Sequence, residues 1–293
     1  MDNIALDILE VFSLYPALLY IGVIMLGLIV GSFLNVVIHR LPLMMEREWQ
    51  RECNALAGHE TPPQEPYNLV APRSGCPQCG HKISAWENIP VISYLILRGR
   101  CASCKTHISL QYPLIELLTA ALSAWVMLRF GLNAAGMAAL LLTWALIALS
   151  VIDIRHTLLP DDITLPFLWL GLLLSIFGIF TSPVDAILGA IYGYGSLFTV
   201  YYLFKWITGK EGMGFGDFKL FALFGAWLGW QALPGIILLS SLVGAVTGIG
   251  LIIFLGRDRQ LPIPFGPFLS VAGWLYLMYG TVINNVYLDW LRL

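Results

Sequence analysis

The chain has 293 residues, of which 58% are hydrophobic and 12% are charged, and its formal net charge is −2. A water-soluble domain usually carries about 25% charged residues, so this composition and the mean hydropathy of +0.78 exclude an ordinary soluble protein. The near-neutral net charge gives no support to nucleic-acid binding. We therefore predict an all-α polytopic membrane protein whose surface contacts the lipid bilayer.

The first apolar run covers residues 14–38 and follows three acidic residues, Asp2, Asp7 and Glu10. A secretory signal peptide has a basic start, a short apolar core and a cleavage site with small residues. None of these features is present. We predict that this run is a retained transmembrane span.

A polar segment, residues 39–112, follows the first span and contains two C-x2-C motifs separated by 21 residues: Cys76 with Cys79, and Cys101 with Cys104. Two such turns can place four thiolates around one Zn²⁺ ion. The spacing predicts a small zinc-ribbon-like insertion with a structural Zn²⁺ site. A four-cysteine site leaves no coordination position for a catalytic water. Two metal-free or redox-active thiol pairs are the alternative.

Seven further apolar segments follow, and most approach the roughly 20 residues that a helix needs to cross a bilayer. With the first span they predict about eight transmembrane helices. The seven segments are 113–130, 134–152, 163–181, 187–206, 217–231, 234–255 and 265–282. We expect three parts in the chain: the first span (1–38), the four-cysteine domain (39–112) and a membrane domain (113–293).

The distribution of Lys and Arg predicts the orientation of the chain. If the N-terminus faces outward, fourteen of the sixteen Lys and Arg residues lie on the cytoplasmic side, and only Arg129 and Arg292 lie outside. Cytoplasmic loops carry an excess of these residues. We therefore expect both termini outside and residues 39–112 in the cytoplasm, where structural disulfides are disfavoured.

Two aspartates lie at predicted span ends on this cytoplasmic boundary. Asp153 follows the third span, and Asp217 begins the sixth, directly after a stretch that contains Gly212, Gly214 and Gly216. Carboxylates at such positions are costly and are often functional. Two adjacent carboxyl groups can share a proton, so that one acts as general base and the other as acid. The pattern predicts a catalytic pair, beside glycines that permit unusual dihedral angles and close approach by a substrate backbone.

Less specific interpretations of the same residues stay open. Asp217 could cap its helix at the N-terminus, and Asp153 could be a solvated carboxylate beside Arg155. Asp161 and Asp162 suit the first turn of the fourth span, but Asp161 also competes with Asp153 for the first position of the pair. No H-E-x-x-H motif is present, which argues against a membrane metalloprotease.

Gly27 and Gly31 form a G-x-x-x-G pattern in the first span. Small residues four positions apart allow two helices to pack closely. Close approach by a nucleotide is the less common use of such glycines. We expect helix packing here.

The chain resembles the bacterial prepilin peptidases, also called type IV leader peptidases. Five blocks of sequence carry the resemblance in the order of the family and over nearly the whole chain. They are Gly31–Pro42, the four-cysteine segment that ends in Tyr112–Glu116, Asp153–Asp162, Glu211–Lys219 and Pro262–Pro267.

This resemblance implies a bifunctional enzyme of the bacterial inner membrane. Such proteins cleave the basic leader of type IV prepilins and type II secretion pseudopilins at the cytoplasmic face. They then methylate the new N-terminal amine with S-adenosylmethionine. The family's aspartic peptidase residues correspond to Asp153 and Asp217 here. The resemblance also links the N-terminal blocks and the four-cysteine domain to methylation, but no residue is assigned to the methyl donor.

Two other functions use the same aspartates. Other Gly-x-Gly-Asp intramembrane peptidases place a carboxylate pair deeper in the bilayer and lack a four-cysteine domain. An ion-coupled transporter would use Asp153 and Asp217 as proton or cation sites. The absence of a clear inverted repeat of broken helices argues against a transporter.

Overall fold

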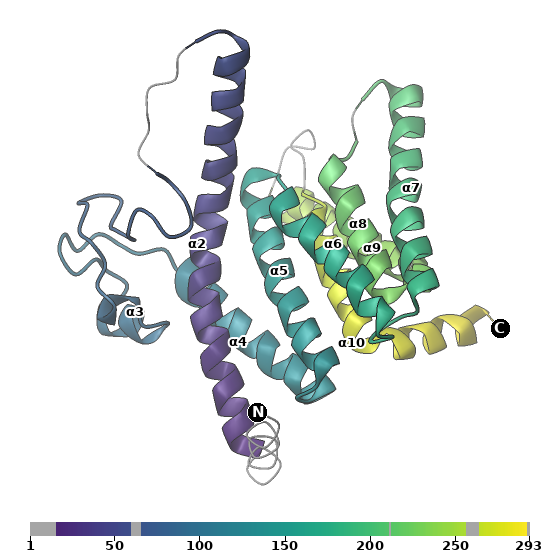
Figure 1. Ribbon diagram of the computed structural model, residues 1–293, viewed down its shortest axis with the longest axis horizontal. Helices are drawn as coiled ribbons and strands as arrows, with labels where there is room; N and C mark the ends of the chain where they lie inside the picture. Colours follow the sequence, from purple (N-terminus) through teal and green to yellow (C-terminus); the bar gives the residue numbers. More distant parts are fainter. Residues whose placement is uncertain (1–15, 60–65, 211, 256–263, 292–293) are drawn as a thin grey trace. The chain divides into compact units, whose positions relative to one another are not determined.

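The computed structural model describes residues 16–59, 66–210, 212–255 and 264–291 (Figure 1). The acidic start of the chain, the beginning of the first predicted span and parts of two family-like blocks lie outside these ranges. The described helices are α2 (Pro16–Leu56), η1 (Trp86–Asn88), α3 (Ile92–Ile96), α4 (Gln111–Phe130), α5 (Ala134–His156), α6 (Asp161–Ile176), α7 (Pro183–Thr208), α8 (Phe215–Leu228), η2 (Trp230–Ala232), α9 (Leu233–Leu255) and α10 (Gly266–Leu291). Within the described ranges β-structure is limited to two isolated bridges, so the all-α prediction is confirmed.

The chain forms two compact units, Met1–Trp144 and Ala145–Leu293. Helix α5 begins in the first unit and ends in the second. The predicted functional ranges 1–38, 39–112 and 113–293 concern activity and stay a prediction. Each unit is described separately below.

In the first unit, α2 and α4 pack as an antiparallel pair. Gly27 lies against Ala120, and one turn later Gly31 lies against Glu116. A Cβ atom would come within 2.6 Å of the Ala120 Cα at the first position and within 2.7 Å of the Glu116 Cα at the second. Only glycine fits this approach of the two backbones. The expected G-x-x-x-G helix packing is therefore confirmed.

Helix α2 does not end with the apolar run at residue 38 but continues through Pro42 to Leu56. At 41 residues it is about 60 Å long, twice the thickness of the hydrocarbon core. An interior proline removes one backbone hydrogen bond and crowds the carbonyl four residues earlier, a local cost that this helix tolerates. The following residues 43–56 are rich in Leu, Met, Glu and Arg, which favour helix. The fall in hydropathy after residue 38 thus marks the point where the helix surface changes from apolar to polar, and not the end of the helix.

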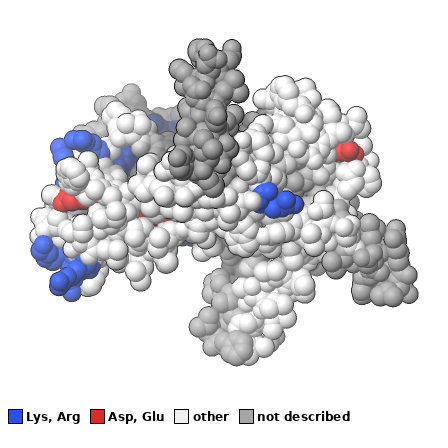
Figure 2. Space-filling model, turned by 90° about the horizontal axis from the view of Figure 1, so that it is seen from below, with Lys and Arg blue, Asp and Glu red and all other residues white. Residues whose placement is uncertain are grey.

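Residues 66–110 form the cysteine-containing segment of the first unit. It holds η1 and the five-residue α3, and it exposes five basic side chains against a single acidic residue, Glu87. The basic residues are Arg73, Lys82, Arg98, Arg100 and Lys105. Lys and Arg gather over this segment in Figure 2, whereas most of the remaining described surface in that view is uncharged. An uncharged, largely apolar surface suits contact with lipid.

In the second unit α8 is the central helix. Ten of its fourteen residues are buried, as expected for a helix that is apolar on all sides. Gly225 of α8 meets Gly189 of α7 backbone to backbone, and the Trp227 indole N–H donates to the Phe167 carbonyl of α6 at 2.7 Å. Helices α6, α7 and α10 surround α8, and α9 packs against α10.

Each of the eight predicted spans corresponds to a helix, and six described helices are long and apolar enough to cross a membrane. The two shorter ones are α6, with 16 residues, and α8, with 14. Their lengths of about 24 and 21 Å fall short of a hydrocarbon core of about 30 Å. The chain is a multi-pass membrane protein, and the count of eight spans is approximate.

Candidate active site and metal centre

One end of the second unit collects the acidic residues that the sequence singles out. Asp153 lies in the last turn of α5, Asp161 begins α6, and Asp217 lies in the first turn of α8. These helix ends lie together in Figure 1. Two of these side chains, Asp153 and Asp217, are buried, whereas the Asp161 side chain is 48% exposed.

Asp153 and Asp217 are the buried members. They are 5% and 7% exposed, respectively, and their carboxyl groups are close enough to interact electrostatically. Asp153 Oδ2 accepts the backbone N–H of Gly266, at the start of α10, at 3.0 Å. Asp217 Oδ1 is buried and has no hydrogen-bond partner among the described residues. Such an oxygen can accept a shared proton or a bound water.

Asp217 is not the N-cap of α8. The cap position is Gly214. Asp217 is the third residue of the helix, and its backbone N–H donates to the Gly214 carbonyl at 3.2 Å. The interpretation of Asp217 as the N-cap residue is therefore wrong.

Asp161 has different surroundings from Asp153. The Lys219 ammonium donates to both carboxylate oxygens of Asp161, at 2.8 and 2.6 Å. The Asp161 side chain is 48% exposed. Asp161 and Asp162 occupy the first turn of α6, as expected from the favourable interaction of negative charge with a helix N-terminus. This ion pair joins α6 to α8 beside the buried aspartates.

Leu159, in the loop between α5 and α6, packs against Gly216 and Gly266, the two glycines beside the buried aspartates. A Cβ atom on Gly216 would lie 2.7 Å from the Leu159 Cβ, and one on Gly266 would lie 3.1 Å from the Leu159 Cδ2. Gly216 precedes Asp217, and Gly266 binds Asp153. One buried side chain thus lies against both glycines that flank the pair, a contact that no motif in the sequence indicates.

The three glycines before α8 have separate surroundings. Gly214 has an extended backbone conformation, with φ −81° and ψ 150°, and Gly216 lies within α8, so neither uses the unusual dihedral angles that glycine permits. Gly212 lies against the Phe204 ring and Gly216 against Leu159, whereas Gly214 has only Asp217 Oδ2 near its Cβ position, at 3.7 Å. Of the three, only Gly214 leaves space for another backbone beside Asp217.

An aromatic cluster from α7 and α8 lies next to Asp217. Phe218 is fully buried, and its ring centroid is 5.6 Å from that of Tyr201 and 5.4 Å from that of Phe215. Aromatic pairs at these distances stabilise the contact between two helices. The cluster fixes the first turn of α8, which carries Asp217.

In the first unit the four predicted cysteines converge on one point. Their sulfur atoms all lie within 4.8 Å of one another, with 3.7 Å between Cys76 and Cys104 and 4.0 Å between Cys79 and Cys101. A tetrahedral site with bonds of about 2.3 Å has sulfur atoms about 3.8 Å apart. None of these cysteines is in a disulfide. The four thiols fit one tetrahedral metal ion.

The two C-x2-C motifs are a structural repeat. Cys76 N–H donates to the His81 carbonyl, and Cys101 N–H donates to the Thr106 carbonyl. Each motif also closes with an isolated bridge, Gly75 with Lys82 and Arg100 with His107. Inspection of the Cys spacing alone misses this repeat, although Ile-Ser follows both motifs at the same distance.

Backbone N–H groups favour a thiolate at the first cysteine of each repeat. Those of Cys79 and Gln78 lower the pKa of the Cys76 thiol to about 6, and those of Cys104 and Ser103 lower the pKa of Cys101. A thiolate is the form that binds metal. The same N–H donors would hold the sulfur atoms in place around an ion.

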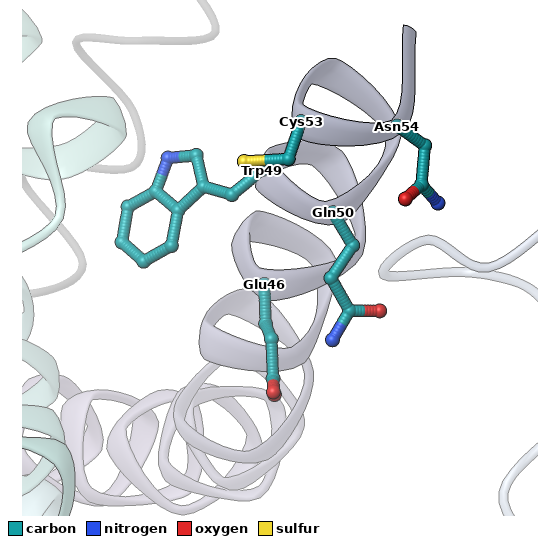
Figure 3. A pocket seen from close by; sticks show the side chains of 5 residues that line it. All are labelled: Glu46, Trp49, Gln50, Cys53 and Asn54. Atoms are coloured by element: carbon teal, nitrogen blue, oxygen red, sulfur yellow. The ribbon is translucent and has the colours of Figure 1, made fainter. Parts of the chain in front are cut away.

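A shallow pocket lies on the C-terminal part of α2, lined by Glu46, Trp49, Gln50, Cys53 and Asn54 (Figure 3). All five side chains come from one helix, so no second element encloses the pocket. Cys53 is exposed and does not join the other four cysteines. We assign no chemistry to this surface.

A multi-pass helical protein with two buried carboxyl groups at one end of its helices has the groups that a membrane aspartic peptidase requires. Comparison with known families then gives two matches. Residues 25–130 match the bacterial peptidase A24 N-terminal domain, and residues 140–249 match the type IV leader peptidase family.

Curated relatives match over almost their full length. The chain is 53% identical to the prepilin leader peptidase/N-methyltransferase of Pseudomonas aeruginosa over 285 residues, which cover 97% of this chain and 98% of that protein. It is 54% identical to the protein of the same name from Aeromonas hydrophila over 283 residues, 96% of this chain and 98% of that one. No solved structure matches the chain. The chain belongs to the type IV leader peptidase family, and the resemblance noted from its motifs is confirmed.

Proposed function

We propose that this chain is a prepilin leader peptidase and N-methyltransferase that uses Asp153 and Asp217 as its catalytic pair. The observation that carries the proposal is the burial of both carboxyl groups at one end of the second unit, together with the unpartnered oxygen of Asp217. Family membership and the names of relatives support this activity over a transporter and over other Gly-x-Gly-Asp peptidases.

The chemistry follows from two carboxyl groups that cannot both ionise easily. The pair shares one proton, and the ionised member removes a proton from a water molecule as the water attacks the scissile carbonyl. The protonated member polarises that carbonyl and then supplies a proton to the leaving amine. The Gly266 N–H fixes Asp153 through Oδ2. The apparent pKa values of such a pair belong to both residues together.

The substrates proposed are type IV prepilins and type II secretion pseudopilins. Their basic leader would lie at the membrane surface, and their apolar helix would enter from the bilayer. The open position at Gly214 allows the substrate backbone to pass within reach of Asp217. A short α8, which places Asp217 at a helix start and not in the middle of a span, is consistent with cleavage at a membrane boundary.

We further propose that the protein lies in the bacterial inner membrane with the aspartates and residues 39–112 on the cytoplasmic side. The asymmetry of Lys and Arg supports this orientation. The five exposed basic residues of the cysteine segment add to it, because the cytoplasmic leaflet is negatively charged.

The metal of the four-cysteine site is proposed to be Zn²⁺, held by Cys76, Cys79, Cys101 and Cys104. The sulfur positions suit a closed tetrahedral site. In such a site Zn²⁺ stabilises the fold and takes no part in peptide cleavage. Residues 66–110 contain little regular structure, which makes a metal a reasonable source of their stability.

The methylation half of the activity would use S-adenosylmethionine, as the names of the relatives imply. We place it with the first unit, since the A24 N-terminal match covers residues 25–130. In this division the ranges 1–38 and 39–112 serve methylation together with α4 (Gln111–Phe130), which the same match covers, and the rest of 113–293 serves cleavage.

Co-expression with a prepilin, followed by mass analysis of its N-terminus, tests the catalytic pair. Asp153→Asn and Asp217→Asn should each reduce leader cleavage by at least about 100-fold, with normal expression and metal content. Asp161→Asn is the matched control and should retain cleavage. Normal processing by either of the first two variants would remove that residue from the pair. Methylation of a pre-cleaved pilin should survive Asp217→Asn.

A further inference from the structure

The contact between α2 and α4 buries an amide that is only partly satisfied. Asn35 of α2 is 4% exposed, and its Nδ2 donates to the carbonyls of Gly31 and Tyr112 at 3.2 and 3.1 Å. Two carbonyl acceptors fix the orientation of the amide, because only the nitrogen can donate to them. Asn35 Oδ1 is therefore the remaining atom, and it is buried without a hydrogen-bond partner.

A buried carboxyl group lies at the same crossing. Glu116 of α4 is 7% exposed, lies against Gly31 and follows Tyr112, the partner of Asn35, by one helical turn. No Lys, Arg or His pairs with it among the described residues. Buried carboxylates are normally paired with a cation, so this one lacks its usual partner.

One donor to Glu116 is a strained backbone group. The N–H of Val91 donates to Glu116 Oε2 at 2.8 Å, and Val91 has a φ angle of +61°. A β-branched residue rarely adopts a positive φ angle, and such strain is found at sites that rearrange or bind a ligand. A ligand that replaced this donor would allow the segment to relax.

The two acceptors select the chemistry of the ligand. Asn35 Oδ1 has no donor, and the Glu116 carboxyl has the Val91 N–H and the Ser32 side chain beside it but no cation. These acceptors suit a positively charged group that carries several N–H bonds. A primary ammonium has three donors and no acceptor. A hard metal cation is a poor fit, because Ca²⁺ needs six to eight oxygen ligands and Mg²⁺ an octahedron.

We propose that Asn35 and Glu116 bind a primary α-ammonium group during methylation, an inference that rests on the proposed function. Two molecules of that reaction carry such a group: the newly exposed N-terminus of the pilin and the amino-acid end of S-adenosylmethionine. The N-terminus is the source we favour, because Glu116 could then take part in the reaction.

Glu116 would act as the general base of the methylation reaction. S-adenosylmethionine supplies the methyl group at a positively charged sulfur. The α-ammonium first gives a proton to Glu116, and the neutral amine forms the new N–C bond while the C–S bond breaks and its electron pair stays on sulfur. The methylated nitrogen carries the positive charge that sulfur loses, so charge and atoms balance. Asn35 Oδ1 accepts a remaining N–H and orients the nitrogen lone pair.

The test uses the full-length protein in detergent and the isosteric change Glu116→Gln, which keeps an oxygen for the Val91 N–H. The matched control is Thr119→Val, one turn further along α4, where the buried hydroxyl is already bonded to the Ile115 carbonyl at 2.7 Å. Leader cleavage, binding of a synthetic pilin N-terminal peptide, binding of S-adenosylmethionine and methylation from pH 6 to 9 are measured for each protein.

For Glu116→Gln we expect methylation at pH 7 to fall by about 100-fold, the usual contribution of a general base. It should recover as the pH rises above the α-amino pKa of about 8, while leader cleavage stays unchanged. Peptide affinity should fall about tenfold, and Thr119→Val should match wild type. A loss confined to S-adenosylmethionine affinity would support the same site with the other ammonium as its ligand.

A second comparison changes the peptide, and its first part uses the wild-type protein alone. A peptide that lacks only the α-amino group should bind wild type about tenfold more weakly than the normal peptide and should not distinguish wild type from Glu116→Gln. Equal methylation and equal affinities for wild type and Glu116→Gln would overturn the inference while leaving the proposed function intact. Failure of wild type itself to cleave and methylate would instead refute the proposed function.

Discussion

Replacing Gly266 with Ala would place a methyl group against the carboxyl group of Asp153. The new Cβ would lie 2.6 Å from Oδ2 and 3.2 Å from Cγ, whereas ordinary contact begins near 3.4 Å. Asp153 or the start of α10 must therefore move by about 0.8 Å. A displacement of about 1 Å at a reacting group can cost about 100-fold in rate. We expect kcat for leader cleavage to fall by between about 10- and 100-fold.

The assay is cleavage of a purified prepilin by the full-length variant, with mass detection of the product. Gly195→Ala in α7 is the matched control, because its Cβ would meet nothing within 4 Å. Thermal unfolding of both variants separates loss of activity from loss of structure. Unchanged cleavage by Gly266→Ala in a normally folded protein would show that the position of Asp153 is not critical, and the assignment of this carboxyl to the pair would be wrong.

Three further perturbations test neighbouring parts of the structure. Lys219→Met should lower the free energy of unfolding by less than about 1 kcal/mol, because the ion pair with Asp161 is partly exposed, and cleavage should stay within about threefold of wild type; an inactive but folded variant would give the ion pair a catalytic role. Gly214→Ala, which has ordinary space at its Cβ, should raise KM about tenfold with normal thermal unfolding, whereas Gly216→Ala should lower kcat through its clash with Leu159; an unchanged KM for the first variant would exclude a substrate path there. Cys104→Ser should abolish zinc binding and increase proteolysis of residues 66–110 while leader cleavage continues, and full zinc content, measured by metal analysis, would contradict the four-thiol site.

The helical spans follow from the sequence because bilayer thickness and apolar length are directly related. The end of α2 does not, since hydropathy reports contact with lipid, whereas the helix continues wherever residues such as Glu46 and Arg51 favour it. The lengths of α6 and α8 also escape a hydropathy count. A helix buried among others is as apolar as one in lipid.

The chemistry of the candidate sites is predictable where residue type and spacing define it. The four cysteines are found from their spacing, and the two buried aspartates from their positions at span ends. Their supporting residues are not, because Leu159 and Gly266 act through shape and through a backbone N–H. The sequence likewise does not show that Asp161 lies apart from the buried pair, because its ion-pair partner, Lys219, is 58 residues away in the chain.

The packing of Leu159 has a consequence for how the proposed active site would respond to change. This side chain lies against Gly216 on one side and Gly266 on the other, so the loop between α5 and α6 acts as a common spacer for both carboxyl groups. A movement of this loop would alter the separation of the two acids and the hydrogen bond of Asp153 in a single event. The pair would then pass between competent and incompetent geometries as one unit, and substitutions at Leu159 would impair both acids at once.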